Sequence, residues 1–164
     1  MIKAIAFAIF IGVSMHSNAN EIFIHSLNPV SNRLAILEDN ESIAFLYLTE
    51  AGTQRPIKDA VAYSRKPPAL KKVDWEKIEQ TGDTPLLSKD IASAAAVITN
   101  PSEAEFSFKW SPDGNAVALL RNGEPIAFAS ASEKYGFSKA ISKSSPLANA
   151  WNQGLYEITF GEQP

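Results

Sequence analysis

The chain has 164 residues, with 15 lysines and arginines against 18 aspartates and glutamates, a net charge of −3, and no cysteine. This mild acidity argues against a nucleic-acid partner, because proteins that bind nucleic acid usually present a basic patch. The lack of cysteine excludes disulfides, thiol nucleophiles and cysteine-based metal sites.

The first segment, Met1–Ala19, has the order of a signal peptide. A lysine comes first, an unbroken apolar run follows, and the small residues of Ser17-Asn18-Ala19 precede the expected cleavage site before Asn20. The alternative is an uncleaved N-terminal anchor, although the apolar run is short for a bilayer span. We expect a periplasmic or secreted protein with no membrane span after cleavage of the leader.

Four apolar segments with turn residues between them predict strands in the first part of the mature chain. In the third of these segments apolar residues fill both alternating sets of positions, which is typical of a strand deep in a sheet. The several carboxylates of the acidic turn Glu38–Glu41 could bind a cation, but the turn lacks the glycine and ligand spacing of a calcium loop, so we interpret it as a solvated turn. The expected strands cover Glu21–Leu27, Arg33–Leu37, Ser42–Thr49 and Ile57–Tyr63.

The character of the chain changes over Ser64–Glu103, a charged stretch that we interpret as an insertion between strands. Within it, Lys71–Gln80 places three apolar residues on one side of a short helix that Gly82 would end. For Ile91–Thr99 helix and strand both remain open, because its alanines favour the former and its β-branched residues the latter.

The clearest pattern runs from Glu105 to Ser130 and predicts three antiparallel strands joined by two tight turns. Aromatic residues alternate with polar ones up to Trp110, as in a half-buried strand. The first turn is Ser111-Pro112-Asp113-Gly114, in which glycine supplies the positive φ. The second is Asn122-Gly123, a strong hairpin signal because both residues accept positive φ.

Together these patterns predict a mainly β (α+β) fold, with an antiparallel meander sheet and a short helical insertion. Residues 20–164 are expected to form a single globular domain around one sheet, with the meander near its middle. Leu155–Phe160 alternates in polarity and is expected to be the final strand.

The meander also carries a resemblance. Its Trp110-Ser111, Asp113-Gly114 and Asn122-Gly123, in that order, resemble the uncharacterised bacterial family called domain of unknown function 2251. The likeness covers roughly Asn32 to Trp151. It implies a compact domain of bacterial origin, and it carries over no activity and no functional residue.

The candidate binding residues lie in the irregular stretch Ser132–Gly154. Aromatic side chains beside cations are common interface anchors, and a loop on a rigid sheet is a frequent place for them. The alternative for Phe137 and Trp151 is that they close one end of the core. The candidates are Tyr135, Phe137, Lys139 and Trp151.

Catalytic signatures are sparse. The predicted mature chain has a single histidine, His25, without a nucleophile-elbow motif, and one such ligand is too few for a common zinc site. We therefore predict no catalytic residues, no metal and no cofactor. The function that fits best is an exported small binding or inhibitor protein, of the immunity type, whose partner is another protein. The alternative is a carboxylate-dependent hydrolase acting on a cell-envelope glycan or peptide.

Overall fold

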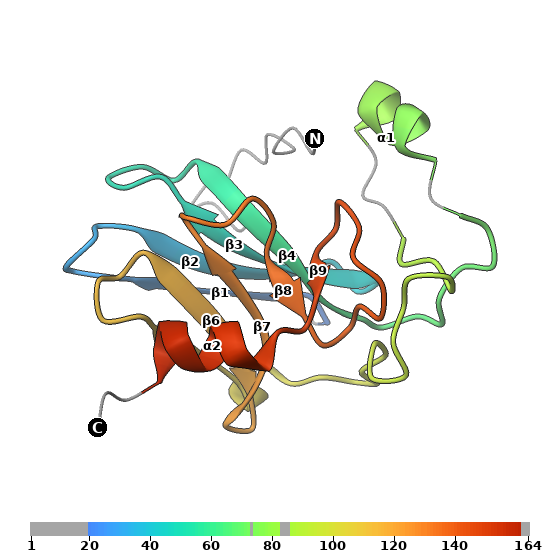
Figure 1. The fold of residues 1–164 in the computed structure, drawn as a ribbon. Helices are drawn as coiled ribbons and strands as arrows, with labels where there is room; N and C mark the ends of the chain where they lie inside the picture. Colours follow the sequence, from blue (N-terminus) through green and yellow to red (C-terminus); the bar gives the residue numbers. More distant parts are fainter. Residues whose placement is uncertain (1–19, 73, 83–85, 162–164) are drawn as a thin grey trace.

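The computed structural model describes residues 20–72, 74–82 and 86–161, and they form two β-sheets with two short α-helices (Figure 1). The predicted mainly β fold with an antiparallel meander is confirmed. The expectation of a single sheet is wrong, because the strands divide into a four-stranded and a five-stranded sheet. The expected leader Met1–Ala19 lies outside the described residues.

The first sheet is an antiparallel meander in the order β1-β2-β3-β4, and it matches the four strands expected from the sequence. Every residue of β3 is buried, as its two apolar faces predict. The strands are β1 (Ile22–Leu27), β2 (Leu34–Asp39), β3 (Ile43–Thr49) and β4 (Pro56–Ser64).

The second sheet has the order β5-β6-β7-β8-β9 and is antiparallel except for its last, parallel pair. Asn122 and Gly123 have φ of 51° and 82°, and Arg121 pairs with Glu124, so the predicted two-residue turn is confirmed. The meander lies at an edge of this sheet, not in the middle of a single one. The strands are β5 (Phe106–Trp110), β6 (Ala116–Arg121), β7 (Glu124–Ser130), β8 (Phe137–Ser138) and β9 (Asn149–Ala150).

The main core lies between the two sheets. Val117 and Leu119 of β6 are fully buried in it, and the ring of Phe106 stacks on Tyr63 of β4 with centroids 5.4 Å apart. Each such apolar side chain stabilises the fold by roughly 1.5–3 kcal/mol through removal from water. Packing of β7 against β3 and β4 makes this core continuous from one sheet to the other.

The expected final strand is wrong: those residues belong to helix α2 (Gln153–Phe160), which lies across the outer face of β6 and β7 (Figure 1). The side chain of Asn152 accepts a bond from the Leu155 N–H and so begins the helix. Its apolar residues cover a second cluster in which Phe160 contacts Phe128. The helix is favoured because the sheet leaves an apolar outer face that one helical stripe can cover.

The insertion follows the prediction in part. Helix α1 (Trp75–Thr81) ends at Gly82, whose φ is 68°. Helical content is not confined to this stretch, since α2 lies elsewhere. Ile91–Thr99 forms neither helix nor named strand; its backbone instead bonds the edge of β4, where the Ser64 N–H donates to Ala96 O and Ile98 N–H donates to Ser64 O. In the described ranges no helix is both long enough and apolar enough to cross a membrane.

Candidate functional site

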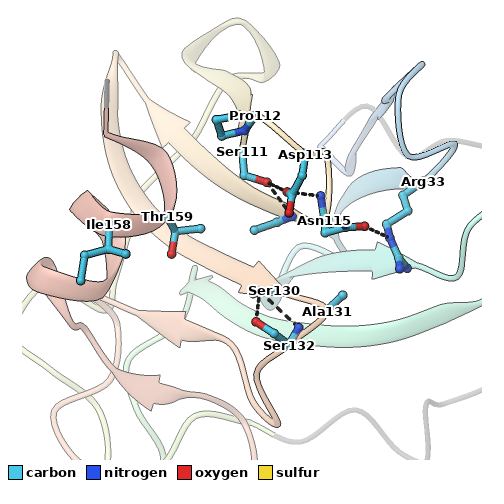
Figure 2. A pocket seen from close by; sticks show the side chains of 11 residues that line it. Arg33, Ser111, Pro112, Asp113, Asn115, Ser130, Ala131, Ser132, Ile158 and Thr159 are labelled. Atoms are coloured by element: carbon cyan, nitrogen blue, oxygen red, sulfur yellow. Dashed lines mark hydrogen bonds between the residues drawn. The ribbon is translucent and has the colours of Figure 1, made fainter. Parts of the chain in front are cut away.

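A groove of about 640 Å³ opens where the β5–β6 turn, the end of β7 and the last turn of α2 meet (Figure 2). Its polar lining consists of four hydroxyl groups, one carboxylate, one amide and one guanidinium. The lining residues are Arg33, Ser111, Pro112, Asp113, Asn115, Ala116, Ser130, Ala131, Ser132, Ile158 and Thr159.

The carboxylate of Asp113 is held in place by its own turn. It accepts hydrogen bonds from Ser111 Oγ at 2.7 Å and from the Asn115 N–H at 2.9 Å, as the dashed lines in Figure 2 show. These bonds, the one from Asn115 first, hold the pKa of Asp113 below its usual range. Asp113 is therefore an anion at neutral pH and suits accepting hydrogen bonds, not donating a proton.

Arg33 reaches the groove from the β1–β2 turn. Its Nε donates to Asn115 Oδ1 and its Nη1 to the Thr49 carbonyl, each at 2.9 Å. A guanidinium carries five N–H donors, so these two bonds fix its orientation and leave donors for a ligand. Because Asn115 contacts both Arg33 and Asp113, the groove holds a cation and an anion at set positions.

The remaining polar groups are hydroxyls on the other wall. Ser130 Oγ and Ser132 Oγ are 3.0 Å apart, and Figure 2 places Thr159 of α2 facing them across the groove. Ile158 stands at the rim with 80% of its surface exposed. Such a lining can bind a polar group that both donates and accepts hydrogen bonds.

Two of the residues predicted for binding lie mainly within the fold. Phe137 is buried and stacks on Phe128 with centroids 4.7 Å apart, while Trp151 meets the same ring edge-on at 5.4 Å. The indole N–H of Trp151 donates to Gln153 Oε1 at 2.9 Å. Both aromatics thus pack in the cluster under α2, which is the alternative weighed for them from the sequence.

The other two predicted residues are half-exposed. Lys139 Nζ lies 4.8 Å from the centroid of the Trp151 ring, and Lys134 Nζ lies 5.3 Å from that of Tyr135. Each pair is a cation–π contact. The structure therefore brings Phe137, Lys139 and Trp151 together, whereas Tyr135 makes a separate pair with its neighbour in sequence.

Two carboxylates with raised pKa lie on the outer face of the first sheet, on either side of Tyr47. Burial raises the pKa of Asp59 to about 6. Burial, and then the charge of Glu21, raise the pKa of Glu38. Tyr47 pairs with Asp59 across β3 and β4, and its own pKa is raised by burial and by the two carboxylates. Neither carboxylate lines the groove of Figure 2.

A buried polar network that the sequence did not indicate centres on Asp39. Its side chain is fully buried and accepts hydrogen bonds from Tyr63 Oη at 2.5 Å and Arg65 Nε at 2.8 Å. Arg65 also donates to the carbonyl of Asn20, which anchors the start of β1. The acidic turn weighed as a cation site thus contributes its aspartate to this network. Among the residues that the structure describes, no three His, Asp or Glu side chains converge as metal ligands would.

Comparisons with protein-family models, curated proteins and solved structures found no match for this chain.

Proposed function

We propose that this chain is an exported binding or inhibitor protein of the immunity type, whose partner is another protein. The order of charge, apolar run and small residues over Met1–Ala19 supports export. Intact mass of the protein recovered from a periplasmic extract is expected to begin at Asn20. A full-length cytoplasmic species contradicts this part of the proposal.

The observation that carries the binding proposal is the fixed pair of charges in the groove of Figure 2. Arg33 and Asp113 are each oriented by neighbouring groups, so a ligand meets them without an ordering cost. Asp113 stays ionised because its pKa is lowered, which favours recognition over acid catalysis at this position. Hydroxyls around the pair match the polar side chains and backbone groups of a protein surface.

The groove is tested by chemical crosslinking in periplasm followed by affinity capture of the tagged protein. Arg33→Ala is expected to lose the captured partner, whereas the matched control Arg55→Ala, an exposed arginine paired only with Glu50 among the described residues, retains it. Ser132→Arg fills the groove without removing either fixed charge, so it separates binding from folding. Retention of the partner by both groove variants, with unchanged melting temperatures, contradicts the groove as the binding site.

The loop predicted from the sequence is tested in the same assay. Tyr135→Ala and Lys139→Glu are compared for partner retention and for melting temperature. Lost retention with stability kept supports an interface at this loop. Loss of stability in Tyr135→Ala, or capture of the partner by both variants, would indicate that these residues have a purely structural role.

A second candidate, a carboxylate-dependent hydrolase, is favoured by Asp59. A carboxyl with a pKa of about 6 keeps a fraction of its protonated form close to neutral pH, and a general acid needs that form. Glu38 is two strands away and two residues further along the sheet, about 12 Å between Cα atoms by strand spacing and rise. The two side chains would have to lean toward each other to reach the roughly 6.5–9.5 Å separation of the carboxyls in inverting glycosidases. Release of reducing ends or free amines from purified peptidoglycan, lost in Asp59→Asn, supports the hydrolase and contradicts a purely binding role.

A further inference from the structure

The two sides of the β-sandwich differ in how their edge strands are covered. On one side the edge of β4 is occupied: Gly136 N–H donates to Asp59 O, and Val61 N–H donates to Leu147 O. On the other side each sheet ends in an edge strand, β1 in the first and β5 in the second. Uncovered edge strands are templates for pairing with another chain.

The register identifies the backbone groups that β1 presents at its free edge. Asn28 N–H donates to Arg33 O, which sets the hydrogen-bonded pairs of the β1–β2 ladder. Because such pairs alternate along an antiparallel ladder, the N–H and C=O groups of Phe23, His25 and Leu27 point away from β2. No described residue forms a backbone bond with these groups from the open side.

The same three residues also present their side chains. Phe23 is 44% exposed and Leu27 is 56% exposed, and His25 lies exposed between them with its ring centroid 6.2 Å from that of Phe23. In a sheet these positions become cross-strand neighbours of any strand added at the edge. One row of three residues therefore offers free main-chain groups and apolar contact together.

A groove of about 610 Å³ runs beside this edge, between β1 and β5. Ile24 and His25 line it from β1, and Phe106 and Phe108 line it from β5. A strand added to β1 would point every second side chain into this groove, where apolar residues are favoured.

The charge at one end of the row specifies the occupant further. Phe23 pairs with Glu38 across the ladder, and the charge of Glu21 contributes to the raised pKa of Glu38. These two carboxylates repel each other at the Phe23 end of β1. A basic residue placed there by an incoming strand would relieve that repulsion.

We propose that the edge of β1 binds an extended segment of a partner protein by strand addition. The segment carries apolar residues at alternate positions, which enter the groove between β1 and β5, and a lysine or arginine that lies beside Glu21 and Glu38. This site is distinct from the groove of Figure 2 and stands independently of the function proposed for that groove.

The probe is a synthetic peptide of sequence Lys-(Val-Thr)3-Val-Lys with a fluorophore, in which the valines share the groove face and the lysines lie on the opposite face with the threonines. It is compared with the same peptide carrying glutamate at both ends. Lysine at both ends makes the test independent of strand direction. We expect the lysine peptide to bind the purified protein about tenfold more tightly than the glutamate peptide. Hydrogen exchange should show new protection at the amides of Phe23, His25 and Leu27.

The matched variants are His25→Pro and His25→Thr. Proline removes an outward N–H that the β1–β2 ladder does not use, whereas threonine keeps it. We expect binding to be lost in His25→Pro and kept within about twofold in His25→Thr. If the proline variant does not fold, hydrogen exchange on the unaltered protein is the test, because it shows whether the peptide protects the amides of β1.

Three results would overturn the proposal. The first is no binding of either peptide at millimolar concentration. The second is equal binding to the two His25 variants, or protection confined to other strands. The third is a concentration-dependent dimer that His25→Pro abolishes, because the occupant of the edge would then be a second copy of this chain.

Discussion

The two turns of the β5–β7 meander each contain a glycine of positive φ, and these glycines have very different surroundings. Gly114 in the first has a φ of 71° and Gly123 in the second has a φ of 82°. A Cβ added at Gly114 would lie 2.5 Å from Asn28 Oδ1, whereas one added at Gly123 would meet nothing within 4 Å. A glycine of positive φ thus lies in one turn that packs against the other sheet and in one that faces solvent.

The packed turn closes one end of the sandwich. Asn28 Oδ1 accepts hydrogen bonds from the Val30 and Ser31 N–H groups, so the side chain that Gly114 touches is itself fixed. Asn115 in turn bonds Arg33 of the β1–β2 turn. The first turn therefore joins the two sheets, and the second only reverses the chain.

The largest expected effect comes from Gly114→Ala. Positive φ and a sub-van der Waals contact act together, and we expect a loss of about 3 kcal/mol in the free energy of unfolding. Urea denaturation of the two proteins measures it. In an Asn28→Ala, Ser31→Ala background the same substitution should cost less, because both side chains that the added Cβ would meet below 3 Å are then truncated. An equal cost in both backgrounds contradicts the contact.

Gly136→Ala measures the cost of a steric clash without any backbone strain, because Gly136 is not among the glycines of positive φ. Its Cβ would lie 2.6 Å from Asp59 O and 2.5 Å from Ala60 Cβ, where the β7–β8 connection crosses β4. We expect a loss of about 2–3 kcal/mol, from overpacking alone. A change below about 0.5 kcal/mol, typical of surface sites, would show that the β7–β8 connection can shift away from β4 at little cost.

Gly123→Ala isolates the dihedral angle, since there is open space around it. The expected loss is about 1 kcal/mol, measured in the same urea titration. Valine at this position should cost more because its branched Cβ resists positive φ. A loss of stability as large as that of Gly114→Ala would contradict the view that steric contact adds to backbone strain only in the first turn.

The smallest expected effect is a pH-dependent contribution of Asp113 to stability, which the second turn lacks. Hydrogen bonds lower the pKa of Asp113 in the folded state, so this residue contributes stability above its unfolded pKa of about 3.9 and loses it as pH falls through the folded value. The stability difference between the unaltered protein and Asp113→Asn should therefore narrow below about pH 4. The cost of Gly123→Ala should not change over the same range. A difference that stays constant into acid contradicts the stabilised carboxylate.

Much of the fold could be predicted from local patterns, and the failures have a common cause. Alternation identified the strands and the positive-φ residues identified the turns, because both are properties of neighbouring residues. Division into two sheets depends on contacts far apart in sequence, as does the close approach at Gly136. Leu155–Phe160 fits strand and helix periods alike, and the cap at Asn152 was the local signal that decides for a helix.

The candidate site was harder for the same reason. Asp113 was predicted as a turn former, which it is, but its groove also needs Arg33 and Thr159 from the two ends of the chain. Local sequence does not show that these segments meet. The aromatics of Ser132–Gly154 stood out by residue type alone, and type did not show that Phe137 is 7% exposed.

The edge of β4 is covered only by residues that come later in the chain, and this order affects how the protein folds. Asp59, Val61 and Ser64 receive their partners from Gly136, Leu147 and Ala96. Until those later residues emerge, the first meander has two open edges and an apolar face awaiting its second sheet. Such nonlocal closure slows folding and leaves the nascent chain prone to association. A chain truncated before Ala96 should accordingly aggregate, although all four strands of its first sheet are present.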